Sequence, residues 1–413
     1  MSKPRIYLVD VTNRDGVQTA RVNLAKLEKT IVNLMLDEVG VFQGEIGFPF
    51  TGHELNYIKA NTELAKKGAF KRMRLEGWCR GIIDDVDKAV KHTDLEHLAL
   101  SISTSDIMIE KKFRGKMGRA EVLKSAEDSC KYALENGVKT ATVNSEDASR
   151  TDIGFLKEFA ATAKAAGAVR VRYCDTLGCE SPQNIYNRIH EVASEVGISM
   201  EMHCHNDLGM VVANSVMGAL GCIDAGYDAF IDVTVNGLGE RAGNADLLST
   251  VLALKYSAGL EGRDVLDPEV VLGHSWKLAN YFSEATGLPI PINQVGVGAN
   301  AFAHESGIHA DGALKDRKNY ELYDYEELGR GDPCVSHTGR IITTGEYGGA
   351  AGLKKVYEDI GLELTDNDQT RELLRLCQYA NLHTQKPLNE AELRFIYTYP
   401  EETELLLTVD PTL

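Results

Sequence analysis

Apolar and polar positions alternate along the first 235 residues in a regular order of short and long segments. Eight short runs are rich in β-branched, aromatic and aliphatic residues, and amphipathic segments with the helical period lie between them. The runs cover residues 6–11, 41–47, 74–79, 98–103, 141–144, 171–174, 200–204 and 229–235, and the clearest helical segments cover 24–39, 85–93, 120–136, 153–166, 182–196 and 210–225. Eight strands with intervening helices predict an α/β fold built as a closed (β/α)8 TIM barrel.

An open, doubly wound sheet is the alternative fold, because it also alternates strands with helices. Dinucleotide-binding sheets of that kind carry a GxGxxG turn after the first strand. Here the first run continues instead as Asp-Val-Thr-Asn-Arg-Asp-Gly-Val-Gln over residues 10–18. The sequence therefore favours the barrel.

The alternation ends near Leu260, and the rest of the chain is predicted to be helical with glycine-rich interruptions. We expect a catalytic barrel domain over residues 1–282 and a mostly helical extension with a lid segment over 283–413. Residues 295–312 form a small-residue loop with two histidines, and a tyrosine-rich stretch follows it. Residues 370–399 predict a pair of helices for packing or dimerisation.

Composition and charge narrow the classes of partner. The chain has 413 residues, of which 43% are apolar, and a net charge of -17. Contacts to nucleic-acid phosphates need a basic surface, so the charge argues against nucleic acid. The eight cysteines form no CxxC pair, and no apolar run reaches membrane-spanning length. These features predict a cytoplasmic protein that acts on small molecules and does not bind a membrane.

His203 and His205 lie two residues apart in a predicted strand, so both imidazoles would point to the same face. A structural pair of buried histidines is the alternative to a metal site. Asp15 follows the first strand, and in a TIM barrel the carboxyl ends of all strands meet at one rim. One carboxylate and two imidazoles would leave open positions on a divalent ion for substrate oxygens, and Asn244 could add a neutral oxygen.

Other polar residues at the predicted rim suit acid, base or electrostatic roles. Arg14 could stabilise an enolate or the oxygen of an attacked carbonyl, and Glu45 and Glu146 could support the metal or move protons. A turn, a helix cap or an ion pair is the alternative for each residue alone. A basic run over residues 111–119 could meet coenzyme A phosphates or a distal carboxylate, with a solvated helix end as the equal alternative.

Several motifs together resemble the DRE-TIM metallolyase family. They are Arg14-Asp15-Gly16, Gly47-Phe48-Pro49, His203-Cys204-His205-Asn206-Asp207, and the segment Gly237–Asn244. Ser306–Gly312 resembles the synthase branch of that family, which includes isopropylmalate, homocitrate, citramalate and Re-type citrate synthases. The resemblance extends from the barrel to about Gly331.

The resemblance implies a divalent metal held by three residues, Asp15, His203 and His205, with Asn244 matching a further asparagine of the metal site. Mn²⁺ is expected, with Co²⁺, Mg²⁺ or Zn²⁺ as alternatives. Acetyl-CoA is implied as co-substrate, because the family's synthases add its methyl carbon to a 2-oxo acid and release CoA.

The resemblance also assigns roles around the reacting groups. Arg14 matches the residue that polarises the carbonyl, Thr176 the one that holds the carboxylate of the oxo acid, and Glu146 the glutamate near the metal. His309 and Tyr320 match residues that reach the active site, often that of the partner subunit. A domain-exchanged homodimer is therefore expected.

The segment Asp10–Thr19 looks most like Re-citrate synthases, which use oxaloacetate. Polar Asn13 stands where relatives have an apolar residue, and a dicarboxylate needs donors for its second carboxylate. We expect Arg80 to bind that group, with Asn13, Gln18 and Glu45 also at the substrate. Homocitrate synthesis from 2-oxoglutarate stays the main alternative. An isopropylmalate or citramalate synthase and a hydroxymethylglutaryl-CoA lyase-like activity are further alternatives.

Overall fold

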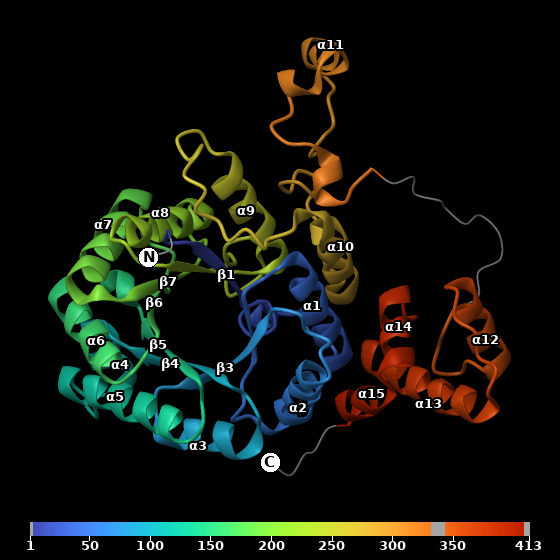
Figure 1. Ribbon diagram of the computed structural model, residues 1–413, viewed down its shortest axis with the longest axis horizontal. Coiled ribbons are helices and arrows are strands. Elements are labelled where there is room, and N and C mark those ends of the chain that lie inside the picture. The colour runs from blue at the N-terminus through green and yellow to red at the C-terminus, as the bar shows by residue number, and fades with distance from the viewer. Residues whose placement is uncertain (1–2, 332–342, 409–413) are drawn as a thin grey trace.

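The computed structural model describes residues 3–331 and 343–408. Eight parallel strands form a closed barrel in which each strand pairs with the next and β8 pairs with β1 (Figure 1). The strands are β1 (Ile6–Asp10), β2 (Gln43–Gly47), β3 (Arg74–Arg80), β4 (His97–Ser103), β5 (Thr140–Glu146), β6 (Arg170–Asp175), β7 (Ser199–Cys204) and β8 (Ala229–Val233). Each predicted run overlaps one strand, so the predicted TIM barrel is confirmed.

Helices surround the barrel and bury an apolar stripe against it. They are α1 (Lys26–Val39), α2 (Gly52–Lys66), α3 (Ile83–His92), α4 (Asp106–Phe113), α5 (Arg119–Glu135), α6 (Ile153–Ala165), α7 (Pro182–Val192), α8 (Val211–Asp224) and α9 (Leu247–Tyr256). The six predicted helical segments correspond to α1, α3, α5, α6, α7 and α8. The pattern did not single out α2, because that helix buries polar side chains, including Glu54, Asn61 and Thr62, beside apolar ones.

Aromatic side chains pack inside the barrel at the amino-terminal ends of the strands. The ring of Tyr7 lies 4.9 Å from that of Phe42 and 5.3 Å from that of Phe230, measured between centroids. Arg170 covers Phe230, with its guanidinium carbon 4.4 Å from the ring centroid. This layer separates the amino-terminal end of the barrel from a charged layer above it.

The charged layer fills the centre of the barrel, where apolar branched side chains are usual. Arg170 and Arg172 of β6 are both buried, and they form ion pairs with Glu201 of β7 and Glu76 of β3. The intervening residue Val171 belongs instead to the apolar core, as the alternation of a strand requires. Unpaired charges here would be strongly destabilising, so the pairing of these residues is a condition of the fold.

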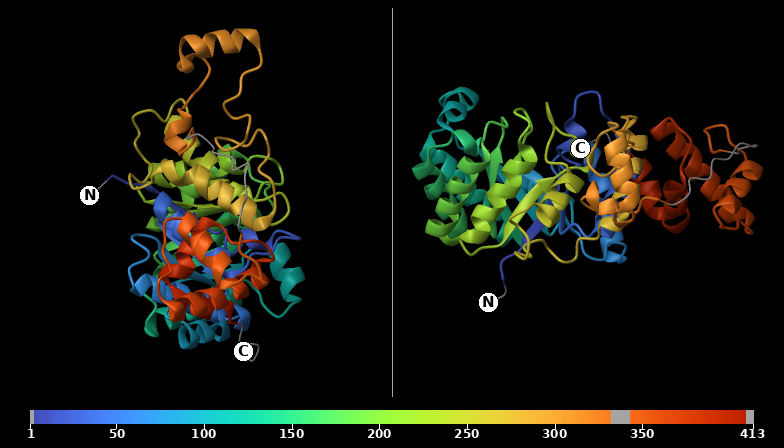
Figure 2. Two further views of the ribbon diagram at one scale, coloured as in Figure 1. Left: turned by 90° about the vertical axis from the view of Figure 1, so that its right-hand side faces the viewer. Right: turned by 90° about the horizontal axis from the view of Figure 1, so that it is seen from above.

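The carboxy-terminal region is helical, as predicted. Its helices are α10 (Ser275–Thr286), α11 (Gly307–Lys315), α12 (Ala350–Asp359), α13 (Asn367–Thr384), α14 (Glu390–Thr398) and α15 (Pro400–Leu407). Helices α14 and α15 contact α1, and α15 also packs on α2, so this group lies beside the barrel (Figures 1 and 2). Residue 282 lies inside α10, and a division into domains 1–282 and 283–413 stays a prediction.

A segment carrying α11 projects from the rest of the molecule, at the top of Figure 1 and in the left view of Figure 2. The predicted helical pair over 370–399 corresponds to α13 and α14.

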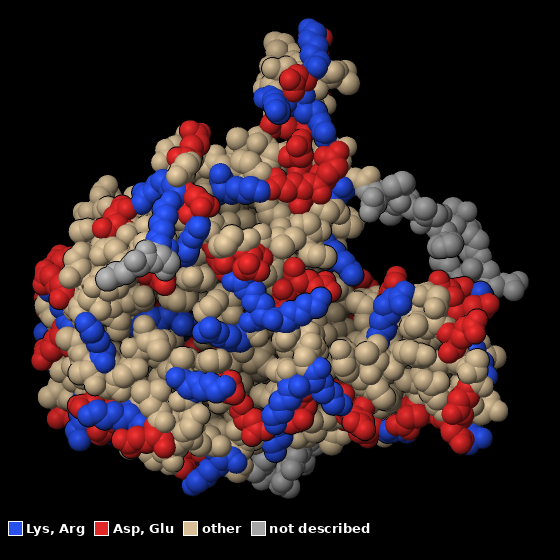
Figure 3. Space-filling view, in the orientation of Figure 1, with Lys and Arg blue, Asp and Glu red and all other residues tan. Residues whose placement is uncertain are grey.

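Seven cysteines of the described chain have free thiols, and Cys334 lies outside the described residues. None of the helices within 3–331 and 343–408 is both long and apolar enough to cross a bilayer. On the face shown in Figure 3, acidic and basic side chains are interspersed.

We predict that docking of α14 depends on pH through Glu392. The Tyr281 hydroxyl of α10 donates a hydrogen bond of 3.0 Å to this buried carboxylate, and burial raises the pKa of Glu392 to about 7. Because the folded pKa lies above the unfolded one, this group's contribution to stability is lost as pH rises toward the folded pKa. Between about pH 5.5 and pH 8 the loss is about 2 kcal/mol.

Glu392→Gln removes this titration, so the variant should gain thermal stability relative to wild type on going from the lower to the higher pH. Glu390→Gln is the control, because Glu390 is an exposed residue of the same helix paired with Arg394. A stability difference between Glu392→Gln and wild type that does not change with pH would contradict the prediction.

Candidate active site

A cavity of about 180 Å³ opens at the carboxyl ends of the strands. Its lining residues come from seven of the eight strands or the loops that follow them. They are Arg14, Asp15, Trp78, Ser101, Asn144, Glu146, Arg172, Cys174, Thr176, His203, His205, Glu240 and Arg241. Six of the predicted site residues are therefore brought together, namely Arg14, Asp15, Glu146, Thr176, His203 and His205.

Asp15 is held by a tight turn directly after β1. The amides of Arg14, Asp15 and Gly16 all donate to the Val11 carbonyl, at 3.2, 2.7 and 3.1 Å, and a short 3-10 helix (Gly16–Gln18) follows. The turn places the carboxylate over the mouth of the barrel. Its Oδ2 atom is buried and has no hydrogen-bond partner among the described residues.

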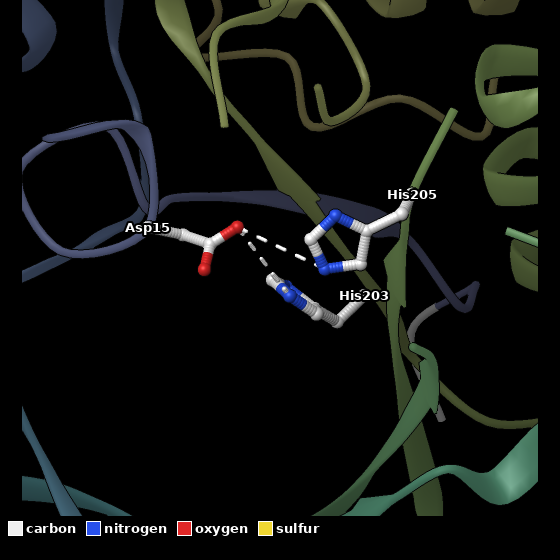
Figure 4. A group of neighbouring side chains, drawn as sticks. All are labelled: Asp15, His203 and His205. Carbon is white, nitrogen blue, oxygen red and sulfur yellow. Dashed lines mark ion pairs between the residues drawn. The ribbon is translucent and has the colours of Figure 1, made fainter. Parts of the chain in front are cut away.

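The two histidines face this oxygen from β7 and its end. The Nε2 atoms of His203 and His205 each lie 3.9 Å from Oδ2 of Asp15 (Figure 4). All three side chains are buried and offer ligand atoms within 4.8 Å of one another. One unsatisfied carboxylate oxygen and two ring nitrogens fit a divalent cation, because these are the ligands that such ions take in proteins.

Asp232 of β8 fixes the orientation of His203. Its Oδ2 lies 2.8 Å from Nδ1 of the imidazole, which directs Nε2 towards Asp15. Burial, with the positive charge of Arg14, lowers the pKa of His203 well below its ordinary value. Burial also lowers the pKa of His205, although the Asp15 carboxylate opposes this. Both imidazoles are therefore neutral near pH 7, and the neutral form is the one that binds metals.

Arg14 lies against the carboxylate of Asp15. Its Nη1 donates 2.7 Å to Oδ1 of Asp15, and its Nε donates to the buried Glu45 of β2. The guanidinium carbon is 5.8 Å from the centroid of Trp78. The contacts to the described residues use Nε and Nη1, and Nη2 is left as a donor for a ligand in the cavity.

Thr176 and Glu146 line the cavity after β6 and at the end of β5. The Thr176 hydroxyl accepts a hydrogen bond of 2.9 Å from the Asp147 amide, so its own hydrogen stays available for a substrate oxygen. Oε2 of Glu146 accepts from Lys112 at 2.5 Å and also from the hydroxyl of Ser103. Lys112, from the basic run, therefore reaches the edge of the cavity.

Asn244 lies beside His205 but does not line the cavity at the carboxyl ends of the strands. Its backbone forms an antiparallel bridge with His205, and its side-chain amide donates 3.3 Å to the Cys204 carbonyl. Its Oδ1 is buried without a hydrogen-bond partner in the described chain. A side chain added at Gly239 would meet this oxygen at 1.7 Å, so only glycine leaves room for the amide.

Four residues expected at the substrate lie outside the cavity lining. The side-chain amide of Asn13 donates 2.8 Å to both the Lys29 carbonyl and Asn33, within the layer between barrel and helices. Gln18 is exposed. Glu45 lies beneath the site, where it accepts from Arg14 and Arg172. These side chains are bound by protein partners or face solvent, and their direct contact with substrate stays a prediction.

Arg80 is the fourth residue that lies outside the cavity lining. It stands at the end of β3, but its guanidinium makes a two-pronged ion pair with Asp85, through contacts of 2.7 Å from both Nε and Nη2. Its side chain is 58% exposed. Asp85 lies only five residues further on, so the local turn captures the arginine. The cations nearest the cavity are instead Arg14, Arg172, Arg241 and Lys112.

His309 and Tyr320 lie on the projecting segment and do not line the cavity of their own chain. Their rings stack with centroids 4.3 Å apart and an interplanar angle of 26°. His309 is exposed, and Tyr320 is 41% exposed. His304 packs edge-on against both. The His309–Tyr320 pair therefore forms within the projecting segment, away from the barrel of its own chain.

Several residues near the cavity were not predicted from the sequence. Arg241 reaches across the mouth to Asp207, at 2.9 Å, and to the Thr176 carbonyl. Its φ of 57° lies in the left-handed region, which indicates a constrained loop. It stands within the segment Gly237–Asn244, so the motif already contained the signal. Asp232 and Trp78 lie inside apolar runs, and only a strand register could have placed them.

Comparison with known proteins gives the family. The family described as HMGL-like matches residues 5–280, and the homocitrate synthase post-HMGL domain-like family matches residues 297–383. The chain is 51% identical over 409 residues to the protein named Citrate (Re)-synthase from Dehalococcoides mccartyi, covering 98% of this chain and 99% of that protein. The chain belongs to the HMGL-like family. The resemblance to DRE-TIM synthases is thereby confirmed.

Other relatives agree at the level of a synthase. The chain is 40% identical to 2-isopropylmalate synthase 2 of Caldanaerobacter subterraneus subsp. tengcongensis, over 95% of each chain. Among solved structures, hydroxymethylglutaryl-CoA lyase from Pseudomonas aeruginosa has a TM-score of 0.56 at 16% identity, over 70% of this chain and 95% of that one. That likeness supports the barrel fold. The prediction of an enzyme of the acyl-transferring synthase type is confirmed.

We predict that Asp15→Asn weakens Mn²⁺ binding at least about tenfold, because the amide keeps the shape of the side chain but loses its charge. Calorimetric titration of the metal-free protein with Mn²⁺ measures the effect. Asp207→Asn is the control, since Asp207 pairs with Arg241 and is not one of the three grouped ligands. Equal affinities of wild type and Asp15→Asn would exclude Asp15 as a ligand.

Proposed function

We propose that the protein condenses acetyl-CoA with oxaloacetate to give citrate and CoA, with a divalent metal at Asp15, His203 and His205. The observation that carries this proposal is the buried group of one carboxylate and two imidazoles beside Arg14. The near full-length similarity to a protein named Citrate (Re)-synthase supports oxaloacetate as the acceptor. Mn²⁺ is the proposed metal, and a reducing cytoplasm fits the free thiols of the described cysteines.

A divalent ion at this site would polarise the carbonyl of the oxo acid and raise its electrophilicity. Arg14 supports the same change, because its unused Nη2 can donate to the oxygen that gains negative charge. The Thr176 hydroxyl can donate to the adjacent carboxylate of the acceptor. These two donors come from different strands and are fixed before the substrate arrives, so they orient the acceptor at little cost in reorganisation.

The condensation itself begins with loss of a proton from the acetyl methyl group. That proton is weakly acidic, so the reaction needs a base together with stabilisation of the enolate oxygen. The carbanion then attacks the ketone carbon, a carbon-carbon bond forms, and the new alkoxide takes up a proton. Water attacks the thioester carbonyl, the carbon-sulfur bond breaks, and CoA leaves as the thiol. Glu146 and the stacked His309–Tyr320 pair are the proposed proton-handling groups.

We propose that His309 and Tyr320 serve the cavity of a partner subunit in a homodimer. They are exposed in their own chain, on a segment that projects from the barrel (Figure 1). Ile308 is 75% exposed and Leu314 is 89% exposed on the same helix, and such apolar exposure favours an interface. Seated over a second barrel, the segment would bury these side chains and exclude water from the enolate.

Homocitrate synthesis from 2-oxoglutarate is the second candidate. Its support is the match of residues 297–383 to the family described as homocitrate synthase post-HMGL domain-like, whereas the 51% identity to the protein named Citrate (Re)-synthase supports oxaloacetate. The two acceptors differ by one methylene, which a binding pocket distinguishes by about 1–3 kcal/mol. Turnover with the two acids therefore separates the candidates directly.

We predict that CoA release from acetyl-CoA depends on added Mn²⁺ and is fastest with oxaloacetate. The assay compares oxaloacetate, 2-oxoglutarate, 2-oxoisovalerate and pyruvate before and after addition of a chelator. Fastest release with 2-oxoglutarate would replace citrate by homocitrate synthesis. Release that persists at full rate after complete metal removal would contradict the metal-dependent mechanism.

We also predict that two inactive variants restore activity when they form mixed dimers. Arg14→Ala damages the barrel site, and His309→Ala damages the lid. If lids cross to the partner, a mixed dimer has one site with both lesions and one intact site, and random pairing returns about one quarter of wild-type activity. If each lid served its own barrel, mixing would give no gain over the separate variants, and the exchanged arrangement would be wrong.

A further inference from the structure

Arg172 occupies the centre of the charged layer directly beneath the candidate metal site. It is 1% exposed, and its guanidinium contributes to the floor of the cavity. Nη1 donates 2.7 Å to Oε1 of Glu45 on β2, and Nε lies 3.2 Å from Oδ2 of Asp232 on β8. Nε also donates to Glu201 of β7. Nη2 lies 3.5 Å from Oε2 of Glu76 on β3. One side chain thus pairs with carboxylates from four strands.

Two of these carboxylates, those of Glu45 and Asp232, connect Arg172 to the two sides of the candidate metal site, Asp15 and His203. Glu45 accepts from Nε of Arg14, and Nη1 of Arg14 donates 2.7 Å to Oδ1 of Asp15. Asp232 accepts from Nδ1 of His203 at 2.8 Å. The contacts form an almost closed chain of alternating acidic and basic side chains whose ends, Asp15 and His203, face each other across the 3.9 Å between Oδ2 and Nε2.

We infer that Arg172 is a positioning residue that sets the distance and orientation between the two sides of the metal site. This inference rests on the proposed metal site. A guanidinium is planar and holds its nitrogens in a fixed fork, so the carboxylates of Glu45 and Asp232 cannot move independently while both are paired with it. The layer is buried, and unpaired carboxylates there are strongly disfavoured.

Arg170 distinguishes this role from general bracing of the barrel. It lies two residues earlier on the same strand and face, it is also buried, and it also pairs with Glu201. Its other described ion pair is with Glu76, at 3.8 Å. Within the described chain, Arg170 forms no ion pair with Glu45 or Asp232. Loss of either arginine removes positive charge from beside Glu76 and Glu201, but only loss of Arg172 also disconnects the residues of the candidate metal site.

The test compares Arg172→Met with Arg170→Met as metal-free proteins titrated with Mn²⁺. We expect Arg172→Met to weaken Mn²⁺ binding about 10- to 100-fold, as is typical when the outer support of a ligand is lost, and Arg170→Met to change it less than about threefold. The visible absorption spectrum of bound Co²⁺ provides a second readout, because it reports ligand geometry. We expect it to change only in the Arg172 variant.

Arg172→Lys keeps the test decisive if the methionine variant does not fold. Lysine retains the charge, but a single ammonium on a flexible stem cannot reproduce the fixed fork. We expect it to fold and to bind Mn²⁺ about tenfold more weakly than wild type, with an altered Co²⁺ spectrum. Wild-type affinity and spectrum in the Arg172 variant, or an equal loss in Arg170→Met, would overturn the inference.

A different experimental result would contradict the proposed function. Wild-type protein that binds neither Mn²⁺ nor Co²⁺ would remove the metal site itself. Metal binding that depends on Arg172, combined with CoA release from acetyl-CoA that is fastest with another oxo acid, would keep the inference and change only the substrate.

Discussion

The pairing of buried charge inside the barrel is the interaction on which the rest of this structure depends. Arg14, Arg170 and Arg172 are buried with five carboxylates, those of Asp15, Glu45, Glu76, Glu201 and Asp232. If all eight groups were ionised, three positive charges would face five negative ones in a buried region. Burial accordingly raises the pKa of Glu76 to about 7 and that of Asp232 well above its ordinary range, against the opposing effect of the arginines.

This imbalance links stability to the proposed chemistry. A divalent cation among Asp15, His203 and His205 would supply positive charge where the network lacks it, so binding should be coupled to the order of the whole layer. The same network keeps Arg14 pointed into the cavity, with one nitrogen left unused by the described residues. An active site built on such a layer is preorganised, because its polar groups are fixed by one another before any ligand binds.

The molecule divides its tasks between a rigid and an extended part. The barrel fixes Asp15, His203 and His205 at strand ends, and α14 and α15 pack against its side. The segment with α11 instead carries a stacked His309–Tyr320 pair on a surface with exposed apolar side chains. Residues on a projecting segment can approach and leave a bound ligand, which strand residues cannot do without disturbing the barrel.

The sequence by itself determined the barrel and the core of the site. Strand and helix periods are local properties, and the i, i+2 spacing of His203 and His205 fixes their common face wherever the strand lies. The rule that strand ends share a rim then brought Asp15 to them. Only the tertiary structure decided which polar side chains remain available for a ligand. Asn13 and Arg80 are bound by Asn33 and Asp85, and Glu45 by Arg14 and Arg172.

Those ion pairs and hydrogen bonds form because residues from different strands lie in the same layer of the barrel interior. Arg172 and Asp232 lie 60 positions apart in the chain and touch at 3.2 Å because β6, β7 and β8 are neighbours in register. The spacing of residues along the chain does not show which of them share a layer. Whether two charged groups pair depends on their distance in space, so only the assembled barrel shows which residues contact those of the candidate metal site.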